Sequence, residues 1–279
     1  KHGFYLHFLN IINICFICCL HMTKIFGILN ITPDSFSDGG LNFEPERAVK
    51  TLESMRVNNI FAVDIGAEST RPNAITISPE EEIERLKIIL PTAVKIGLTV
   101  SLDSRNLQTV EWGLNQGVHI INDVSGFKDI KMIKLVKQFK AKAVFMHSLT
   151  VPANPNIVMN EKGFIKEIYD FAKAKIEEFT KYGVSAEDLM FDPGIGFGKT
   201  GGQSIEIVKN IELFYSLGVK VLVGHSRKSF LKTAFKNQSP TMEEKDLMTS
   251  VFSSYLIAKK VAFLRLHNFE IISSLIDKR

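Results

Sequence analysis

Acidic and amide side chains stand at the ends of short apolar runs in this chain. Asp103, Asn122 and Asp192 each occupy such a position. Their carboxylate and amide oxygens accept hydrogen bonds, so together they suit a planar heterocycle that presents several N–H donors. We therefore expect these three residues to bind a nitrogen-containing ring.

Donors and positive charge follow two later apolar runs. The residues concerned are Ser226, Arg227, Lys228, Arg265 and His267. Hydroxyl, imidazole and cationic groups of this kind bind phosphate oxygens. A set of ring acceptors and a set of anion donors in one chain predict a reaction that releases or transfers a phosphate group.

Two segments rich in turn-forming residues follow the first and second apolar runs. Segments 30–40 and 66–78 are both longer than the roughly 2–6 residues usual for a strand-to-helix connection, so we expect mobile lids. A third segment, the glycine-rich run 194–202, lacks the acidic residue of a dinucleotide site, and Pro193 stands where a Walker loop needs glycine. We expect this run to form a flexible pocket wall, with Phe197 as a stacking surface.

Short apolar runs alternate with helical patterns through residues 22–279. The runs are nearly continuous rather than alternating, which is typical of parallel strands covered on both faces. The pattern predicts strands at 25–30, 60–65, 99–102, 120–124, 143–147, 189–192, 221–223 and 263–266. It predicts helices at 46–58, 79–95, 107–116, 130–140, 163–182, 204–216, 243–260 and 269–278.

Eight strand–helix units in about 255 residues predict an α/β fold, a (β/α)8 TIM barrel that forms a single domain over residues 22–279. An open doubly wound sheet is the alternative, because periodicity alone does not show whether a sheet closes. A barrel of this kind builds its active site from the C-terminal ends of its strands and the loops after them. Closure would therefore bring the polar residues together.

The composition excludes several classes of protein. The 279-residue chain has a net charge of +4, too small to indicate nucleic-acid binding, and its three cysteines all lie within residues 15–19. Residues 22–279 therefore contain no disulfide framework and no thiol nucleophile. The apolar segment 4–20 is shorter than the roughly 20 residues of a membrane span, so we expect residues 1–21 to be an apolar leader or linker outside the barrel. We expect a cytoplasmic protein with no nucleic-acid or membrane partner.

Seven short segments carry most of these residues: NITPDSFSDGG, DIGAESTRP, SLDS, INDVSG, FDPGIGFGKT, GHSRKSF and RLHN. In this order and spacing, over residues 24 to about 275, they resemble the dihydropteroate synthase family. The resemblance implies a transferase of folate biosynthesis that joins 6-hydroxymethyl-7,8-dihydropterin diphosphate to p-aminobenzoate, forming 7,8-dihydropteroate and pyrophosphate. It also implies Mg²⁺ as the cofactor and sulfonamides as competitors of p-aminobenzoate. The family is often dimeric and is commonly fused to an upstream pyrophosphokinase domain, so a homodimer and such a domain are expected partners.

The resemblance also implies roles for individual residues. It places pterin contacts at Asp103, Asn122, Asp192 and Lys228, diphosphate contacts at Thr70, Arg71, Arg265 and His267, magnesium ligands at Asn30 and Asp38, and the aminobenzoate pocket at Phe36, Pro72, Phe197 and Ser229. Lys228, Asp103 and Arg71 are the candidate catalytic residues. In one departure from the family pattern GGESTRP, Ala67 stands in place of the second glycine.

The reaction explains why these residue types are needed. When the carbon–oxygen bond breaks, the departing diphosphate gains negative charge and the methylene carbon becomes a cation conjugated with the ring. Donors and Mg²⁺ stabilise the first charge, and carboxylates near the ring favour the second. The arylamine attacks as a neutral nucleophile, so no strong base is required.

Three other functions fit parts of the pattern. A pterin-binding methyltetrahydrofolate methyltransferase would share the ring acceptors but would need neither residues 226–228 nor the two lids. A Schiff-base lyase would use Lys228 or Lys199, but we expect neither lysine to have the apolar surroundings that lower the pKa of an amine. A barrel kept only for binding or scaffolding would have lost motif residues, and the motif positions are all present.

Overall fold

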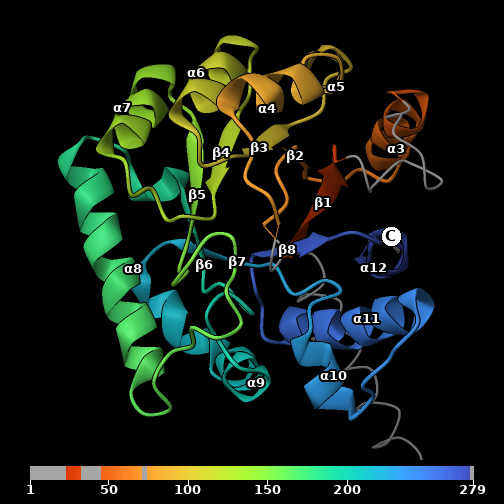
Figure 1. The fold of residues 1–279 in the computed structure, drawn as a ribbon, viewed down its shortest axis with the longest axis vertical. Coiled ribbons are helices and arrows are strands. Elements are labelled where there is room, and N and C mark those ends of the chain that lie inside the picture. The colour runs from red at the N-terminus through yellow and green to blue at the C-terminus, as the bar shows by residue number, and fades with distance from the viewer. Residues whose placement is uncertain (1–22, 33–44, 71–73, 277–279) are drawn as a thin grey trace, which may run out of the picture.

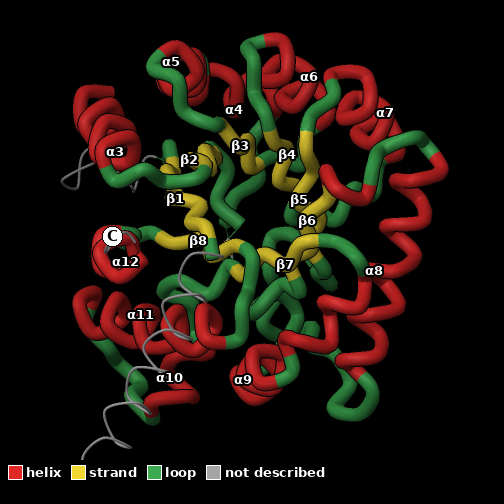
Figure 2. The backbone as a smooth tube through the Cα atoms, turned by 180° about the vertical axis from the view of Figure 1, so that it is seen from behind, coloured by secondary structure: helices red, strands yellow, loops and turns green. Residues whose placement is uncertain are grey.

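The computed structural model describes residues 23–32, 45–70 and 74–276. Within those residues, eight parallel strands close into a barrel in chain order, and the helices surround it (Figure 1; Figure 2). The (β/α)8 barrel is confirmed, and the open doubly wound sheet is wrong because β8 pairs with β1. The strands are β1 (Lys24–Asn30), β2 (Ala62–Gly66), β3 (Val100–Asp103), β4 (Ile120–Asp123), β5 (Lys142–Met146), β6 (Leu189–Asp192), β7 (Lys220–Val223) and β8 (Phe263–Leu266).

Several predictions fall on residues that the structure does not describe. The leader or linker at 1–21 lies outside the described residues, as do Phe36, Asp38, Arg71 and Pro72. Most of the first predicted lid and part of the second lie outside them too. In the described part of the chain, no helix is long and apolar enough to cross a membrane.

The helices follow the predicted order with three differences. The predicted helix 79–95 is split in two, the helix predicted at 204–216 starts earlier and changes to a 3-10 helix, and α10 was not expected. The helices are α3 (Pro45–Val57), α4 (Pro79–Leu86), α5 (Ile89–Lys95), α6 (Leu107–Asn115), α7 (Ile130–Phe139), α8 (Phe164–Lys181), α9 (Gly201–Lys209), α10 (Phe230–Phe235), α11 (Met242–Ala258) and α12 (Glu270–Ile276). Two short 3-10 helices are η1 (Ala186–Asp188) and η2 (Ile211–Leu217).

A proline and a helix cap explain two of these differences. Pro91 has no N–H to donate to the Lys87 carbonyl, and in a continuous helix its ring would collide with that carbonyl. The helix therefore breaks before Pro91, between the end of α4 and the start of α5. The earlier start of α9 follows from a capping box. Thr200 Oγ1 accepts from Gln203 N at 3.1 Å, and Gln203 Oε1 accepts from Thr200 N at 2.9 Å.

Apolar side chains from seven of the strands fill the part of the barrel interior nearer the strands' N-terminal ends. The rings of Phe26 and Phe263 meet edge to face there, with centroids 5.3 Å apart. A larger cluster packs the outward faces of the strands against the helices, with Leu52 and Phe179 fully buried in it. The interior layer consists of Phe26, Ala62, Ile120, Val144, Met190, Leu222 and Phe263.

The polar residues of interest stand above this apolar layer. Asp64, Asn122, Asp192 and Arg265 each lie two positions beyond one of its members. Because side chains alternate along a strand, residues two apart point to the same side. The strand period therefore aims these four side chains into the barrel, at the C-terminal ends of the strands.

The chain turns sharply after β6 and crosses the end of β5. Gly194 makes this turn at a φ of +70°, and a Cβ added there would lie 1.9 Å from the His147 carbonyl oxygen. Gly218, which follows η2, has a φ of +75° and nothing within 4 Å of an added Cβ. The two glycines share a backbone conformation and differ in the space around it.

Gly194→Ala should lower the free energy of unfolding much more than Gly218→Ala. The left-handed conformation costs alanine roughly 1–2 kcal/mol at either position, whereas the Gly194 variant must also displace the backbone of His147. Urea denaturation of the parent and both variants measures the difference. Equal losses in the two variants would contradict the close approach of the two connections.

Candidate active site

Arg265 lies inside the barrel between two carboxylates. Its Nε donates to Asp64 Oδ2 and its Nη2 donates to Asp103 Oδ2, each at 2.5 Å. Asp64 is fully buried and also accepts from Ser101 Oγ at 2.5 Å and from Asn122 Nδ2 at 3.0 Å. Strands β2, β3, β4 and β8 thus contribute to one hydrogen-bonded group, which we call the arginine cluster.

Burial and the neighbouring charges of the arginine cluster together determine the pKa of Asp103. Burial raises the pKa of Asp103 to about 7; the charge of Arg265 opposes this rise and that of Asp64 adds to it. Burial also works against the charged guanidinium of Arg265, but the neighbouring carboxylates outweigh it and raise the Arg265 pKa. Near neutral pH, Arg265 therefore stays charged, whereas Asp103 can hold or release a proton.

Asp192 and Lys228 form a second group in the interior. Asp192 Oδ1 accepts from the backbone N–H two residues later at 2.7 Å, and burial raises the Asp192 pKa against the charges of Lys228 and Arg265. Lys228 Nζ donates to Ile195 O at 2.7 Å and lies 4.6 Å from the centre of the Phe197 ring. Burial lowers the pKa of Lys228 to about 8, with the charge of Asp192 opposing the shift.

Lys199 is buried and Lys228 is partly buried, and burial lowers the pKa of both, so the expectation that neither amine has surroundings that lower its pKa is wrong. Burial lowers the pKa of Lys199 to about 7. Lys199 Nζ lies 2.9–3.1 Å from His147 Nδ1 and from the carbonyl oxygens of His147 and Phe197. The glycine-rich connection after β6 is therefore anchored to the end of β5, where its composition had predicted a flexible wall.

Ser226 and His267 meet where β7 and β8 end. Ser226 Oγ accepts from His267 N at 3.2 Å and lies 3.1 Å from His267 Nδ1. Arg227 does not join them, because its guanidinium donates to both carboxylate oxygens of Asp246 on α11, at 2.6 and 2.8 Å. The Arg227 guanidinium is thus already paired with an acid, and its expected contact with phosphate stays a prediction. The acid that neutralises it comes from a helix that the sequence did not place beside it.

The other predicted residues in the described part lie around the same end of the barrel. Asn30 is the last residue of β1, and Ser229 directly precedes α10. Thr70 lies in the connection after β2 and accepts through its backbone oxygen from the connection after β5 at 3.3 Å. Phe197, after β6, is buried in a small apolar cluster with Met146 of β5. Each of these residues therefore lies at the C-terminal end of its strand or in the connection that follows it.

Several buried residues near this end received no role from the sequence, among them Asp64, His147 and Glu82. Asp64 lies in strand β2, Glu82 lies in helix α4 and His147 directly follows β5, and for Asp64 the two-residue strand period was the available signal. Glu82 lies on α4, and burial raises its pKa. Glu82 Oε2 accepts from Ser104 Oγ at 3.1 Å, Asn106 Nδ2 at 2.8 Å and Thr109 Oγ1 at 2.6 Å.

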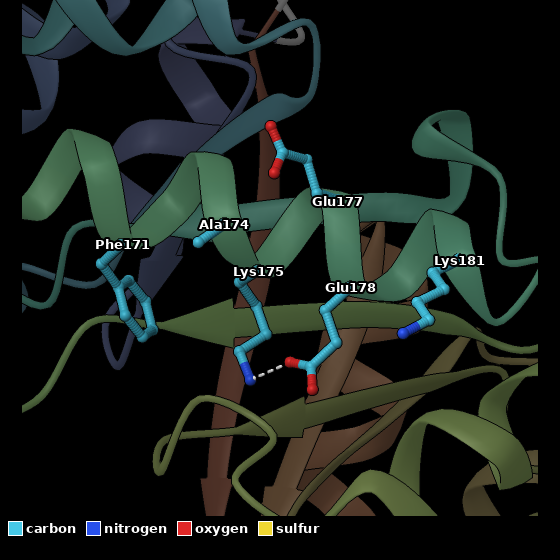
Figure 3. A pocket seen from close by; sticks show the side chains of 6 residues that line it. All are labelled: Phe171, Ala174, Lys175, Glu177, Glu178 and Lys181. Atoms are coloured by element: carbon cyan, nitrogen blue, oxygen red, sulfur yellow. Dashed lines mark hydrogen bonds and ion pairs between the residues drawn. The ribbon is translucent and has the colours of Figure 1, made fainter.

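A separate hollow lies along α8. Figure 3 shows the side chains that line it, all from this helix. Lys175 Nζ donates to Glu178 Oε2 at 2.5 Å and to Phe127 O at 3.0 Å. The lining contains none of the predicted site residues, so the hollow has no link to the polar group in the barrel. Its lining residues are Phe171, Ala174, Lys175, Glu177, Glu178 and Lys181.

The model of one protein family, described as pterin binding enzyme, matches residues 26–267. The chain belongs to the pterin-binding enzyme family. A dihydropteroate synthase of Clostridium beijerinckii is 35% identical over 249 residues, which make up 88% of this chain and 89% of that protein. The family resemblance inferred from the seven sequence segments is confirmed.

Solved structures of other pterin-binding enzymes have the same fold. The dihydropteroate synthase of Xanthomonas albilineans with 4-aminobenzoic acid has a TM-score of 0.83 and 27% identity, with 92% of both chains covered. The enzyme of Anaplasma phagocytophilum with bound 6-hydroxymethylpterin-monophosphate has a TM-score of 0.82 and 32% identity, with 92% of this chain and 97% of that chain covered.

Some relatives in this family are much longer. A probable bifunctional folylpolyglutamate synthase/dihydropteroate synthase of Halobacterium salinarum is 36% identical over 207 residues, which are 74% of this chain. The matched part is only 25% of that protein. This chain therefore spans about a quarter of the length of such a relative.

Replacing Asp64 should change the titration of Asp103. In Asp64→Asn, the negative charge that raises the Asp103 pKa is lost while Arg265 remains, so the midpoint should fall below about 7. Carboxyl carbon NMR, with Asp103→Asn to assign the resonance, measures this midpoint. The control is Asp170→Asn, which removes an exposed carboxylate paired with Lys166 and should leave the midpoint unchanged. A midpoint that stays the same or rises in Asp64→Asn would contradict the arginine cluster.

Proposed function

We propose that this chain is a dihydropteroate synthase, which joins 6-hydroxymethyl-7,8-dihydropterin diphosphate to p-aminobenzoate and releases pyrophosphate. The observation that carries the proposal is the buried set of acceptors and cations at the C-terminal ends of the strands, where Asp64 and Asp103 hold Arg265. Synthases of matching fold were solved with a pterin monophosphate and with 4-aminobenzoic acid, which supports the same ligand classes for this chain.

The pterin ring would bind among Asn122, Asp103 and Asp192. Asn122 donates through Nδ2 to Asp64 Oδ2, and this bond orients the amide so that Oδ1 is its acceptor for a ring N–H. Asp103 and Asp192 supply carboxyl oxygens whose raised pKa values allow a proton to be shared with ring nitrogens. The three acceptors come from three strands and converge on one interior space.

Lys228 would donate to an acceptor atom of the ring. An ammonium group has three N–H donors, and only one of them is needed for the bond to Ile195 O. The adjacent Phe197 ring offers an aromatic face for the benzene ring of p-aminobenzoate. Phe36, Pro72 and Ser229 are the other residues that we assign to this pocket.

Magnesium would bind near the end of β1. Mg²⁺ usually keeps several waters and takes one or two protein oxygens together with substrate phosphates. Within the described ranges, no group of three or more His, Cys, Asp or Glu side chains could hold a metal. Mg²⁺ needs only one or two protein oxygens, and the Asn30 amide at the C-terminal end of β1 can supply one of them. Asn30, with Asp38, would hold the ion, which would neutralise charge on the departing diphosphate.

The protein groups then act on two developing charges. The bond between the methylene carbon and a diphosphate oxygen breaks, and its electron pair leaves with the oxygen. Asp103 and Asp192 favour the cation on the ring side. The amine nitrogen of p-aminobenzoate bonds to the methylene carbon and then loses a proton, giving dihydropteroate and pyrophosphate. The donors assigned to the diphosphate oxygens are Thr70, Arg71, Arg265 and His267.

The matched relatives favour a synthase over the methyltetrahydrofolate methyltransferase, because their names give the synthase activity. A cytoplasmic location stays a prediction. A homodimer and an upstream pyrophosphokinase domain stay predictions. The second activity named for the Halobacterium salinarum relative is a folylpolyglutamate synthase.

A pyrophosphate-release assay tests the proposed function. With the pterin diphosphate, p-aminobenzoate and Mg²⁺ all present, the chain should release pyrophosphate and form dihydropteroate in equal amounts. Chelation of Mg²⁺ should slow the reaction because the charge on the leaving group is then less well compensated. Omitting p-aminobenzoate is the control. Absence of product with both substrates present would refute the synthase and leave the methyltransferase to be assayed with methyltetrahydrofolate.

Lys228→Ala should lower kcat/KM by roughly 100-fold or more while the fold is retained. The substitution removes a charged donor from a buried site, and donors of this kind are worth about 10²–10³ in rate. Steady-state kinetics measure the loss, and thermal unfolding checks the fold. Lys166→Ala, which removes a lysine with 79% of its side chain exposed on α8, is the matched control. Near-normal turnover of Lys228→Ala would remove this lysine from the mechanism.

A further inference from the structure

A buried lysine outside the predicted catalytic set joins two connections of the barrel. Lys199 is only 6% exposed, and it lies in the connection after β6. Its Nζ is 2.9 Å from His147 Nδ1, 3.1 Å from His147 O and 3.0 Å from Phe197 O. His147 directly follows β5, and Phe197 lies two residues before the lysine itself. One ammonium group therefore ties the end of β5 to the glycine-rich run.

The three acceptors match the three N–H donors of an ammonium group. Burying an ammonium group costs free energy unless its N–H donors are hydrogen-bonded, so this site requires all three acceptors to be in place. Burial lowers the pKa of His147 to about 3, and the charge of Lys199 adds to the shift. The neutral imidazole can thus accept at Nδ1, which places its own proton on Nε2.

Further hydrogen bonds and a close packing contact join the same two connections. His147 N donates to Asp192 O at 3.0 Å, and Met159 N donates to Gly198 O at 2.9 Å. A Cβ added to Gly198 would lie 2.5 Å from Leu149 Cγ. The glycine-rich run is therefore fitted closely against the chain that follows β5, and Lys199 is the charged anchor of this fit.

The anchored run carries two residues that the Lys228 amine contacts. Lys228 Nζ donates to Ile195 O at 2.7 Å and lies 4.6 Å from the centre of the Phe197 ring. Lys199 holds the carbonyl of Phe197 itself. A displacement of this run would move the Phe197 ring and would release a bond to Lys228.

We propose that Lys199 is a positioning residue, which holds residues 194–200 so that Phe197 forms a fixed wall of the aminobenzoate pocket beside Lys228. The inference rests on the proposed function for the identity of the ligand. Asp192 is the last residue of strand β6, and the pairing of β6 with β5 fixes its backbone independently of the run 194–200. Loss of Lys199 should therefore impair p-aminobenzoate binding much more than pterin binding.

The kinetic test compares two Michaelis constants in Lys199→Met, which keeps the length of the side chain and removes its donors. The KM for p-aminobenzoate should rise about tenfold, equivalent to about 1.4 kcal/mol, while the KM for the pterin diphosphate changes less than about twofold. Lys209→Met, which changes an exposed lysine on α9, is the matched control and should alter neither constant. Equal rises in both constants would indicate a merely structural role and overturn the proposal.

A double-mutant cycle tests whether Lys199 acts through Phe197. If it does, Lys199→Met combined with Phe197→Leu should have nearly the p-aminobenzoate KM of Phe197→Leu alone, because the wall that Lys199 positions is already gone. Simple multiplication of the two single effects would show that Lys199 acts independently of this ring and would contradict the proposal.

Hydrogen exchange followed by mass spectrometry tests the anchor without reference to activity. Lys199→Met should increase amide exchange in the peptide that covers residues 194–200, while its peptides from β1 to β4 exchange as in the parent. The control Lys209→Met should exchange like the parent throughout. Unchanged exchange at 194–200 would refute the anchor. If the parent forms no dihydropteroate, the proposed function fails, and the exchange result still decides whether Lys199 holds this run.

Discussion

The barrel interior is organised around one cation, the Arg265 guanidinium between the carboxylates of Asp64 and Asp103. In the low dielectric of a protein interior, buried charges are stable only when they are paired and hydrogen-bonded. This pairing makes it possible for two acids to stand close together at the C-terminal ends of the strands. Burial raises the pKa of Asp103 to about 7 against the charge of Arg265, so the site contains a carboxyl group that can exchange a proton near neutral pH.

The apolar layer beneath this cluster is part of the same arrangement. Phe26, Phe263 and their neighbours fill the other end of the barrel and exclude water from below. Two residues further along several of these strands, the side chains are polar and point toward the C-terminal end of the barrel. The polar side chains of the barrel interior therefore lie at one end. Because side chains two residues apart on a strand point to the same side, the strands that bury the apolar layer also place the polar layer above it.

A second buried basic side chain shapes the other side of the site. Lys199 is held by His147 and Phe197, and it anchors a glycine-rich connection that would otherwise have many conformations. Buried charges of this kind break the usual rule that charged residues remain exposed, and such exceptions concentrate at functional sites. Here the exception places an aromatic ring beside Lys228, where the proposed reaction brings its two substrates together.

The sequence alone determined the eight strands, the order of the helices and the residue types at the strand ends. It also held the signals for two boundaries that were missed, Pro91 for the break between α4 and α5 and Thr200 for the start of α9. These features depend on local sterics, capping and the period of the apolar pattern, which act over a few residues. The tertiary structure decided the partners: Arg227 with Asp246, Arg265 with Asp64, and Lys199 with His147. These pairs join residues 19 to 201 positions apart in the chain, so the packing and register of the strand–helix units bring their charges within hydrogen-bond distance.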